Sequence, residues 1–237
     1  MRKTWALAVS LAVAMGSLGM TTANAAPAPR AGQGAELTML ATTDVHGRVY
    51  NWDYFADKAY ADKFGNTVGL ANVGGVVDAV RAERGADSVV VVDNGDALQG
   101  TPLTTYAAKQ APITETGATH PMAAAYNAIG YDAQNIGNHE FNYGMDLLTT
   151  YRDQLNDPLL AANVLDATTG QPVFTPYTIL TRKTTDNKPV KIGIIGITTP
   201  GSMIWDKANL EGKVTIEDMV TSAKKFRPGL GTVTSIW

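Results

Sequence analysis

The chain has 237 residues, of which 45% are hydrophobic, and its formal net charge is −3 at pH 7. This apolar content is too high for a disordered protein, and a slightly negative charge disfavours a protein that coats a nucleic-acid polymer. Cysteine is absent, which excludes disulfides, thiol catalysis and thiolate metal sites. The composition indicates a globular protein stabilised by its core or by bound metal.

The N-terminal residues have the pattern of an export signal. Arg2 and Lys3 precede an uncharged, largely apolar run over residues 5–20, and an Ala-Asn-Ala cleavage pattern ends at residue 25. The apolar run is too short for a membrane anchor. Residues 1–25 are therefore predicted to be a signal peptide that directs the protein to the periplasm, the cell envelope or the medium. Residues 26–34, rich in Pro and Gly, are predicted to form a flexible leader.

From residue 35 the sequence predicts alternating strands and helices. Leu70, Val73 and Val77 recur at helical spacing, whereas the continuous apolar run over 88–92 is typical of a strand buried on both faces. This alternation predicts an α/β fold with a largely parallel sheet. The predicted strands are 37–42, 88–92, 132–136, 159–164, 173–180 and 191–197, and the predicted helices are 69–84, 121–129, 145–155 and 216–226.

Polar clusters with metal-ligand chemistry follow the first three clear strands: Asp44-Val45-His46, then Asp93-Asn94-Gly95-Asp96, then Gly137-Asn138-His139-Glu140. In an extended chain, residues two apart point to the same side, so Asp44 and His46 are expected to reach one ion. Ligand sites in open α/β sheets lie outside the carboxyl ends of the strands, so all three clusters are expected at one edge. Carboxylate and imidazole ligands suit Mn, Zn, Fe, Co or Mg.

Each cluster alone also has an ordinary structural interpretation. The first is a common short pattern, and the second is typical of a turn whose side chains bond their own backbone. The third can begin a helix, with Asn138 as its cap and Glu140 near the helix dipole. Three such clusters at successive strand ends are much rarer by chance. The remaining histidine, His120, precedes Pro121 at a predicted helix start and is expected to cap or pack, the alternative being a substrate contact.

Together the three clusters resemble the signature of the binuclear metallophosphoesterase (calcineurin-like) family. The surrounding residues 42–47, 92–103 and 137–144 are similar to its bacterial 2′,3′-cyclic-nucleotide 2′-phosphodiesterase/3′-nucleotidase branch. The related 5′-nucleotidases typically have Asn at the position of Thr43 and Asp at the position of Asn142. The resemblance implies that residues 35–226 form a partial metallophosphoesterase domain, the front half of a four-layer αββα sandwich without the C-terminal part of its sheet.

The resemblance also implies a metal-ligand set for two divalent ions. Asp44 and His46 would hold the first ion, and Asp96 would bridge both, because a carboxylate can span a pair of ions. Asn138 would ligate the second ion through its amide oxygen.

For catalysis, the resemblance implies that His139 faces the phosphate and that Asn142 orients it. The nucleophile would be a metal-bound hydroxide. The implied partner is a small nucleotide: 2′,3′-cyclic nucleotides would be opened to 3′-nucleotides, which would then be cleaved to nucleosides and phosphate. Glu140 and Phe141 are assigned to structure.

The sequence departs from the family after His139, because no histidine follows it, whereas the family carries two later histidine motifs. Residues 227–237 are expected to form an atypical tail, and the family's C-terminal nucleotide-binding domain is expected to be absent. We therefore expect a C-terminally truncated chain that holds one ion or none tightly and hydrolyses 2′,3′-cAMP weakly or not at all. Two alternatives stay open: a 5′-nucleotidase or broad phosphomonoesterase, and a secreted fragment without catalytic activity.

Overall fold

The computed structural model describes residues 36–227. The predicted signal peptide, the predicted leader and residues 228–237 of the predicted tail lie outside the described residues. Within residues 36–227, none of the helices has both the length and the apolar character that crossing a membrane requires.

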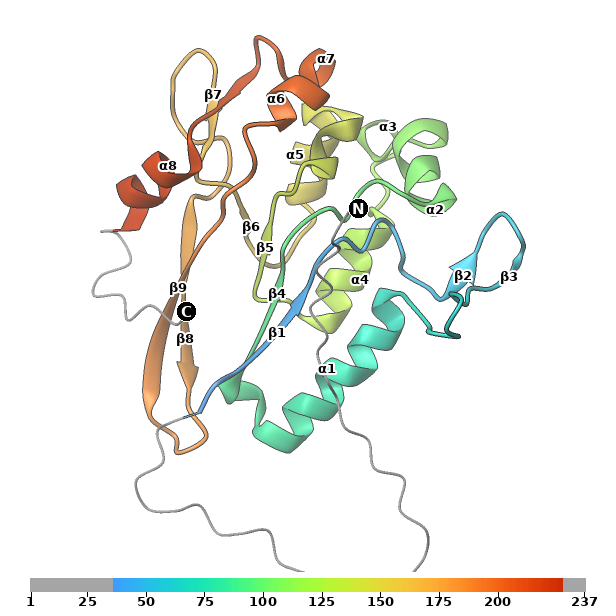
Figure 1. Ribbon diagram of the computed structural model, residues 1–237, viewed down its shortest axis with the longest axis vertical. Helices are drawn as coiled ribbons and strands as arrows, with labels where there is room; N and C mark the ends of the chain where they lie inside the picture. Colours follow the sequence, from blue (N-terminus) through green and yellow to red (C-terminus); the bar gives the residue numbers. More distant parts are fainter. Residues whose placement is uncertain (1–35, 228–237) are drawn as a thin grey trace, which may run out of the picture. The chain divides into compact units, whose positions relative to one another are not determined.

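A four-stranded parallel sheet, in the order β1-β4-β5-β6, forms the centre of the fold (Figure 1). β1 and β4 pair in register, with Thr38 opposite Val89 and Thr42 opposite Asp93. Val89, Val90 and Val91 are each at most 1% exposed, as the continuous apolar run predicted. The strands are β1 Thr38–Thr42, β4 Val89–Asp93, β5 Ala133–Asn135 and β6 Leu159–Leu160.

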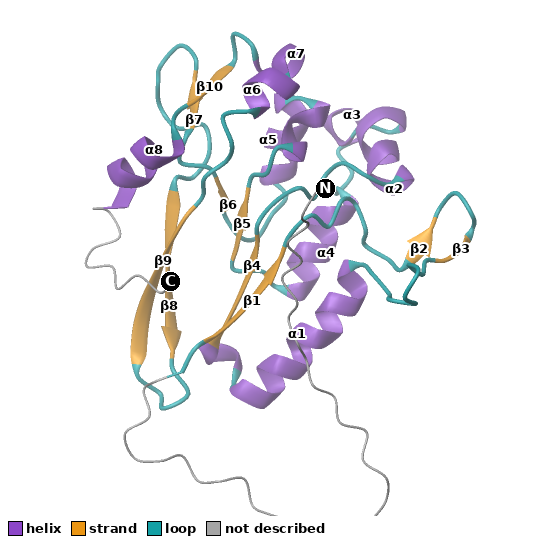
Figure 2. Cartoon of the chain, viewed as in Figure 1, coloured by secondary structure: helices purple, strands orange, loops and turns teal. Residues whose placement is uncertain are grey.

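The helices that connect these strands lie on one face of the sheet (Figure 2). The strand order advances in one direction, and right-handed crossovers then put every connecting helix on the same side. Leu70, Tyr126 and Leu148, one from each main helix, are fully buried in the core between helices and sheet. The main helices are α1 Leu70–Arg84, α4 Pro121–Ile129 and α5 Met145–Arg152.

His120 begins α4. Its ring accepts a hydrogen bond at Nδ1 from the backbone N–H of Met122 (3.2 Å), and Pro121 takes the first helical position. The side chain is fully buried, and burial lowers the pKa of its imidazole to about 4. The expectation that His120 caps and packs is confirmed.

An antiparallel hairpin, β8 Tyr177–Lys183 and β9 Pro189–Ile195, lies on the side of the sheet opposite the helices (Figure 2). Arg182 fastens it by an ion pair with Asp132 and by a hydrogen bond to the carbonyl of Val89 (3.4 Å). The expected parallel arrangement is therefore correct for the central sheet and wrong for these two strands, because a short turn at 184–188 reverses the chain.

The structure also corrects two further predicted strands. The predicted strand 159–164 is divided into β6 and β7 Val164–Asp166, and β7 pairs with the unpredicted β10 Val214–Ile216. Asn163 turns the chain between β6 and β7, since its side chain donates to the carbonyls of Thr198 and Glu217. The predicted strand 173–180 is displaced to begin at Tyr177.

Two helices also differ from their predicted bounds. The predicted helix 216–226 is α8 Met219–Phe226 in the structure, and it begins at Met219 because Asp218 caps it by accepting from the N–H of Thr221 (2.9 Å). The predicted helix 145–155 ends at Arg152. The sequence analysis did not predict these short elements: β2 Trp52–Asp53, β3 Lys58–Ala59, η1 Ala86–Ser88, α2 Pro102–Thr105, the π-helical η2 Tyr106–Gln110, α3 Ile113–Thr116, η3 His139–Tyr143, α6 Ser202–Trp205 and α7 Lys207–Leu210.

Candidate metal centre

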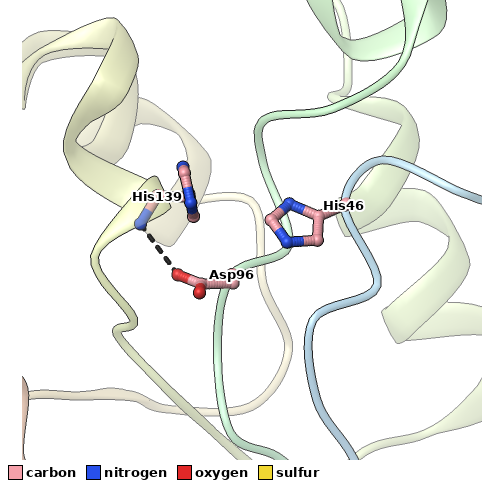
Figure 3. Close-up of side chains that lie close together, drawn as sticks. All are labelled: His46, Asp96 and His139. Carbon is pink, nitrogen blue, oxygen red and sulfur yellow. Dashed lines mark hydrogen bonds between the residues drawn. The ribbon is translucent and has the colours of Figure 1, made fainter. Parts of the chain in front are cut away.

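The three polar clusters meet at the carboxyl edge of the parallel sheet. Beyond β1 and β4 the two segments that follow these strands continue to pair. The backbone N–H of Asp44 donates to the carbonyl of Gly95 (3.0 Å), and the backbone N–H of His46 donates to the carbonyl of Asp96 (2.9 Å). Beyond β5, the N–H of His139 donates to Asp96 Oδ1 (2.8 Å; Figure 3). The prediction that these clusters share one edge of the sheet is confirmed.

The backbone at this edge is unusual. Asp44, His46 and Asp96 have φ values of 54°, 49° and 62°, in the left-handed region that non-glycine residues seldom adopt. The expectation of an extended Asp44–His46 pair is therefore wrong. A turn brings Asp44 Oδ1 to 3.8 Å from His46 Nε2 instead. Residues in this region persist only where neighbouring contacts fix them.

Two glycines let the second and third clusters approach. A Cβ on Gly95 would lie 2.3 Å from the backbone nitrogen of Gly137, and a Cβ on Gly137 would lie 2.3 Å from Asp96 Oδ1. Neither position has room for a methyl group. Gly95 also has a φ of 96°, so it meets both a steric and a conformational requirement.

Glu140 fixes the loop that carries Asp96. Its fully buried carboxylate accepts hydrogen bonds from the backbone N–H groups of Asp96, Ala97, Leu98 and Gly137. Burial raises the pKa of Glu140 to about 7, against the opposing effect of these hydrogen bonds. The assignment of Glu140 to structure is confirmed, although it acts mainly on a loop about 40 residues away rather than as a helix-start charge.

His46, Asp96 and His139 offer ligand atoms that all lie within 4.8 Å of one another (Figure 3). The Nδ1 atom of His46 lies 2.8 Å from the carbonyl oxygen of Gln99. A carbonyl only accepts, so Nδ1 carries the hydrogen and Nε2 keeps a lone pair for a metal. Asp96 uses Oδ1 for His139, which leaves Oδ2. This nitrogen and oxygen donor set fits a divalent ion.

The other two predicted ligands stand at the margins of this cluster. Asp44 is exposed, with 59% of its side chain accessible, and lies beside His46. Asn138 precedes η3, and its side chain makes no capping hydrogen bond there. The helix start therefore does not engage its amide oxygen, and the alternative role of Asn138 as a side-chain cap is wrong.

Behind His139 lies a hydrogen-bonded chain. His139 Nδ1 is 2.7 Å from Asn142 Oδ1, and Asn142 Nδ2 donates to both carboxylate oxygens of Asp206 (3.0 Å each). Asn142 was predicted from the sequence as a site residue, whereas Asp206 was not. No local signal could have found Asp206, because it lies 64 residues from Asn142 and belongs to no motif.

No family model matches the chain. A 2′,3′-cyclic-nucleotide 2′-phosphodiesterase/3′-nucleotidase of Yersinia enterocolitica is 40% identical over 226 residues, which cover 94% of this chain and 32% of that protein. A 5′-nucleotidase of Vibrio vulnificus is 30% identical over 193 residues, which cover 81% of this chain and 30% of that protein.

Among solved structures, the calcineurin-like phosphoesterase YfkN from Bacillus subtilis is similar, with a TM-score of 0.73 and 39% identity. The match covers 83% of this chain and 58% of that chain. The expected α/β fold class is thereby confirmed. The chain spans about a third of the length of the curated relatives it matches.

Proposed function

We propose that the chain is a calcineurin-like metallophosphoesterase over the part it shares with these relatives, and that it serves metal-dependent hydrolysis of nucleotide phosphoesters. The proposed substrates are 2′,3′-cyclic nucleotides and the 3′-nucleotides formed from them. Identity of 40% to a relative of this branch, against 30% to a 5′-nucleotidase, supports this choice over the 5′-nucleotidase alternative.

The observation that carries the proposal is the cluster of His46, Asp96 and His139 within 4.8 Å. We assign a first divalent ion to Asp44, His46 and Asp96, and a second, weaker position to Asp96 and Asn138. A bound divalent ion supplies an activated water and withdraws charge from the phosphoryl oxygens. The Gln99 carbonyl supports this assignment, because it leaves His46 Nε2 free.

His139 is proposed to act on the leaving group. Its Nδ1 is occupied by Asn142, so Nε2 is the ring atom that can hold a proton and pass it to the departing ribose oxygen. When the ring carries that proton, the same N–H can also stabilise negative charge on the phosphate. Asn142 contributes by keeping the ring from rotating.

We further propose that residues 35–226 act as a partial metallophosphoesterase domain and that residues 1–25 direct export. The ligands named here are few for two ions, so the chain alone is expected to turn over 2′,3′-cAMP weakly or not at all. The non-catalytic alternative, a secreted fragment, differs from this proposal by making no metal-dependent contact with nucleotides.

Nucleotide binding tests the proposal without requiring turnover. Calorimetry with the full chain and Mn²⁺ should show 3′-AMP binding more tightly than 5′-AMP, in competition with inorganic phosphate. The D96N variant should lose this binding, whereas D78N, at an exposed position on α1, should retain it. A preference for 5′-AMP would contradict the cyclic-nucleotide branch. Binding of 3′-AMP that is unaffected by Mn²⁺ would contradict the metal-dependent function.

A further inference from the structure

We propose that Asp206 is a positioning residue: acting through Asn142, it sets the tautomer and the ring orientation of His139 at the candidate metal centre. The catalytic consequence rests on the proposed function. The hydrogen-bonded chain itself does not, because it follows from the contacts of three side chains.

Asp206, the buried end of this hydrogen-bonded chain, determines which way the amide of Asn142 points. An ionised carboxylate can only accept hydrogen bonds. Both oxygens of Asp206 lie 3.0 Å from the same terminal atom of Asn142, so that atom must be the NH₂ group rather than the amide oxygen. The amide oxygen of Asn142 must then point away from Asp206, toward His139.

The same logic continues to the ring. The amide oxygen of Asn142 is an acceptor, and it lies 2.7 Å from His139 Nδ1. Nδ1 must therefore carry the hydrogen, which leaves Nε2 as the atom that faces the site with a free lone pair or a second proton. Without Asp206, Asn142 could turn its amide over, and its NH₂ group would then favour the opposite tautomer of His139.

Asp206 is held firmly enough to impose this choice. It is 8% exposed, and its backbone N–H donates to the carbonyl of Ser202 (2.8 Å). Asn209, one turn further along, donates from its side chain to the carbonyl of Phe141 (3.0 Å), next to Asn142. The segment that carries Asp206 is thus attached to η3 at two points, and this attachment limits movement of the carboxylate relative to His139.

The pair also explains why residue 142 is an amide here. A carboxylate at 142 could orient His139 directly, but it would then face the carboxylate of Asp206, and two like charges in one buried site repel each other. Asn142 with Asp206 keeps a single negative charge, displaced from the imidazole by one amide. The two positions are therefore expected to be coupled: exchanging their residues should be tolerated better than changing Asn142 alone to Asp.

The test is the tautomer of His139, measured by ¹⁵N NMR on the full chain at about two pH units above the ordinary histidine pKa of ~6.5, where a typical ring is neutral. The chain has three histidines, so H46N and H120N variants assign the signals. In the wild type we expect the Nδ1–H form to dominate. D206A should lower the ratio of Nδ1–H to Nε2–H at least about fivefold, the equivalent of one hydrogen bond of ~1 kcal/mol.

Four further variants distinguish the positioning role from a purely structural effect. D206N retains an oxygen that can accept from Asn142, so it should restore most of the wild-type ratio. The double variant N142D/D206N should do the same, whereas N142D alone should lower the melting temperature. D146N, at an exposed position of α5, should leave the ratio unchanged.

A D206A chain that is folded and keeps the wild-type tautomer ratio would overturn the inference, as would equal shifts in D206A and D206N. These outcomes are distinct from failure of the proposed function. A tautomer shift in D206A together with Mn²⁺-independent nucleotide binding would sustain the positioning role and reject the catalytic one.

Discussion

Around Asp96 the backbone is held by the buried carboxylate of Glu140 and by the close approach of Gly95 to Gly137. The β8–β9 hairpin is held instead by a regular ladder of seven residue pairs. At the first region, Glu140 alone satisfies four backbone N–H groups. In the hairpin, exposed and half-buried residues alternate along both strands. The candidate site therefore depends on a few residues that have no substitutes, whereas the hairpin distributes its stability over many.

The substitution expected to destabilise the site region most is Gly137→Ala, which adds a single methyl group. G137A would place Cβ 2.3 Å from Asp96 Oδ1 and 2.6 Å from the Asp96 nitrogen, so we expect a loss of about 3 kcal/mol in the free energy of unfolding together with loss of Mn²⁺ binding. G75A, in the middle of α1 with nothing within 4 Å, should instead stabilise by about 0.5–1 kcal/mol. Urea unfolding measures both. Equal effects of the two substitutions would contradict this account of the site.

Replacing Glu140 by Gln tests the same region through hydrogen bonding. A carboxamide has one acceptor oxygen, and its NH₂ group would face backbone N–H donors, so E140Q is expected to destabilise by about 2 kcal/mol. E115Q, at an exposed residue of α3, should change stability by less than about 0.5 kcal/mol. Thermal and urea unfolding provide the measurement. An E140Q protein as stable as the wild type would show that Glu140 does not hold the Asp96 loop.

In the hairpin, the contact with the largest expected effect is the ion pair of Arg182 with Asp132, whose side chains are 22% and 14% exposed. R182A leaves this carboxylate with one partner fewer, and we expect a loss of about 1–2 kcal/mol. K183A removes the neighbouring pair with Asp87, at 3.6 Å and well exposed, and should cost less than about 0.5 kcal/mol. If R182A costs more than G137A, the contrast between the two regions is wrong.

The smallest expected effect is a pH dependence from the buried carboxyl of Asp157. Burial raises its pKa to about 6 from 3.8, so the folded state binds this proton more tightly than the unfolded chain does. Its contribution to stability is therefore fully present below about pH 4 and is lost as the pH rises through about 6. D157N cannot lose a proton and should be about 1 kcal/mol more stable than the wild type near pH 8.

Near pH 4 the advantage of D157N should vanish. D78N, at an exposed residue, should follow the wild-type pH profile. Parallel profiles for the wild type and D157N, from urea unfolding at several pH values, would contradict the shifted pKa.

Long elements with one clear period were predictable. The strand before Asp93 and the helix beginning at Leu70 were predicted almost to the residue, because a buried apolar run and a helical repeat are local signals. The ends of short strands such as β6 were not, since where such a strand stops depends on neighbours far along the chain. The N-terminal end of α8 was predicted too early because strand pairing with β7 takes residues 214–216.

Some residues of the candidate site were likewise predictable from the sequence, and others were not. That Asp44, His46, Asp96 and His139 gather at one edge follows from strand order, although the turn that joins Asp44 to His46 replaced the extended geometry expected. Glu140 and Asp206 act across 43 and 64 residues, respectively. Such contacts form only when the chain has folded, so no local sequence pattern indicates them.

The most direct test of the central claim is Mn²⁺ binding to the full chain by calorimetry. We predict one ion per chain, with affinity falling at least about tenfold in both H46N and D96N. In H120N, where Asn can cap α4 in place of histidine, affinity should be unchanged. Binding that is equally tight in the wild type and D96N, or no binding by the folded wild type, would contradict the assignment of His46 and Asp96 as metal ligands.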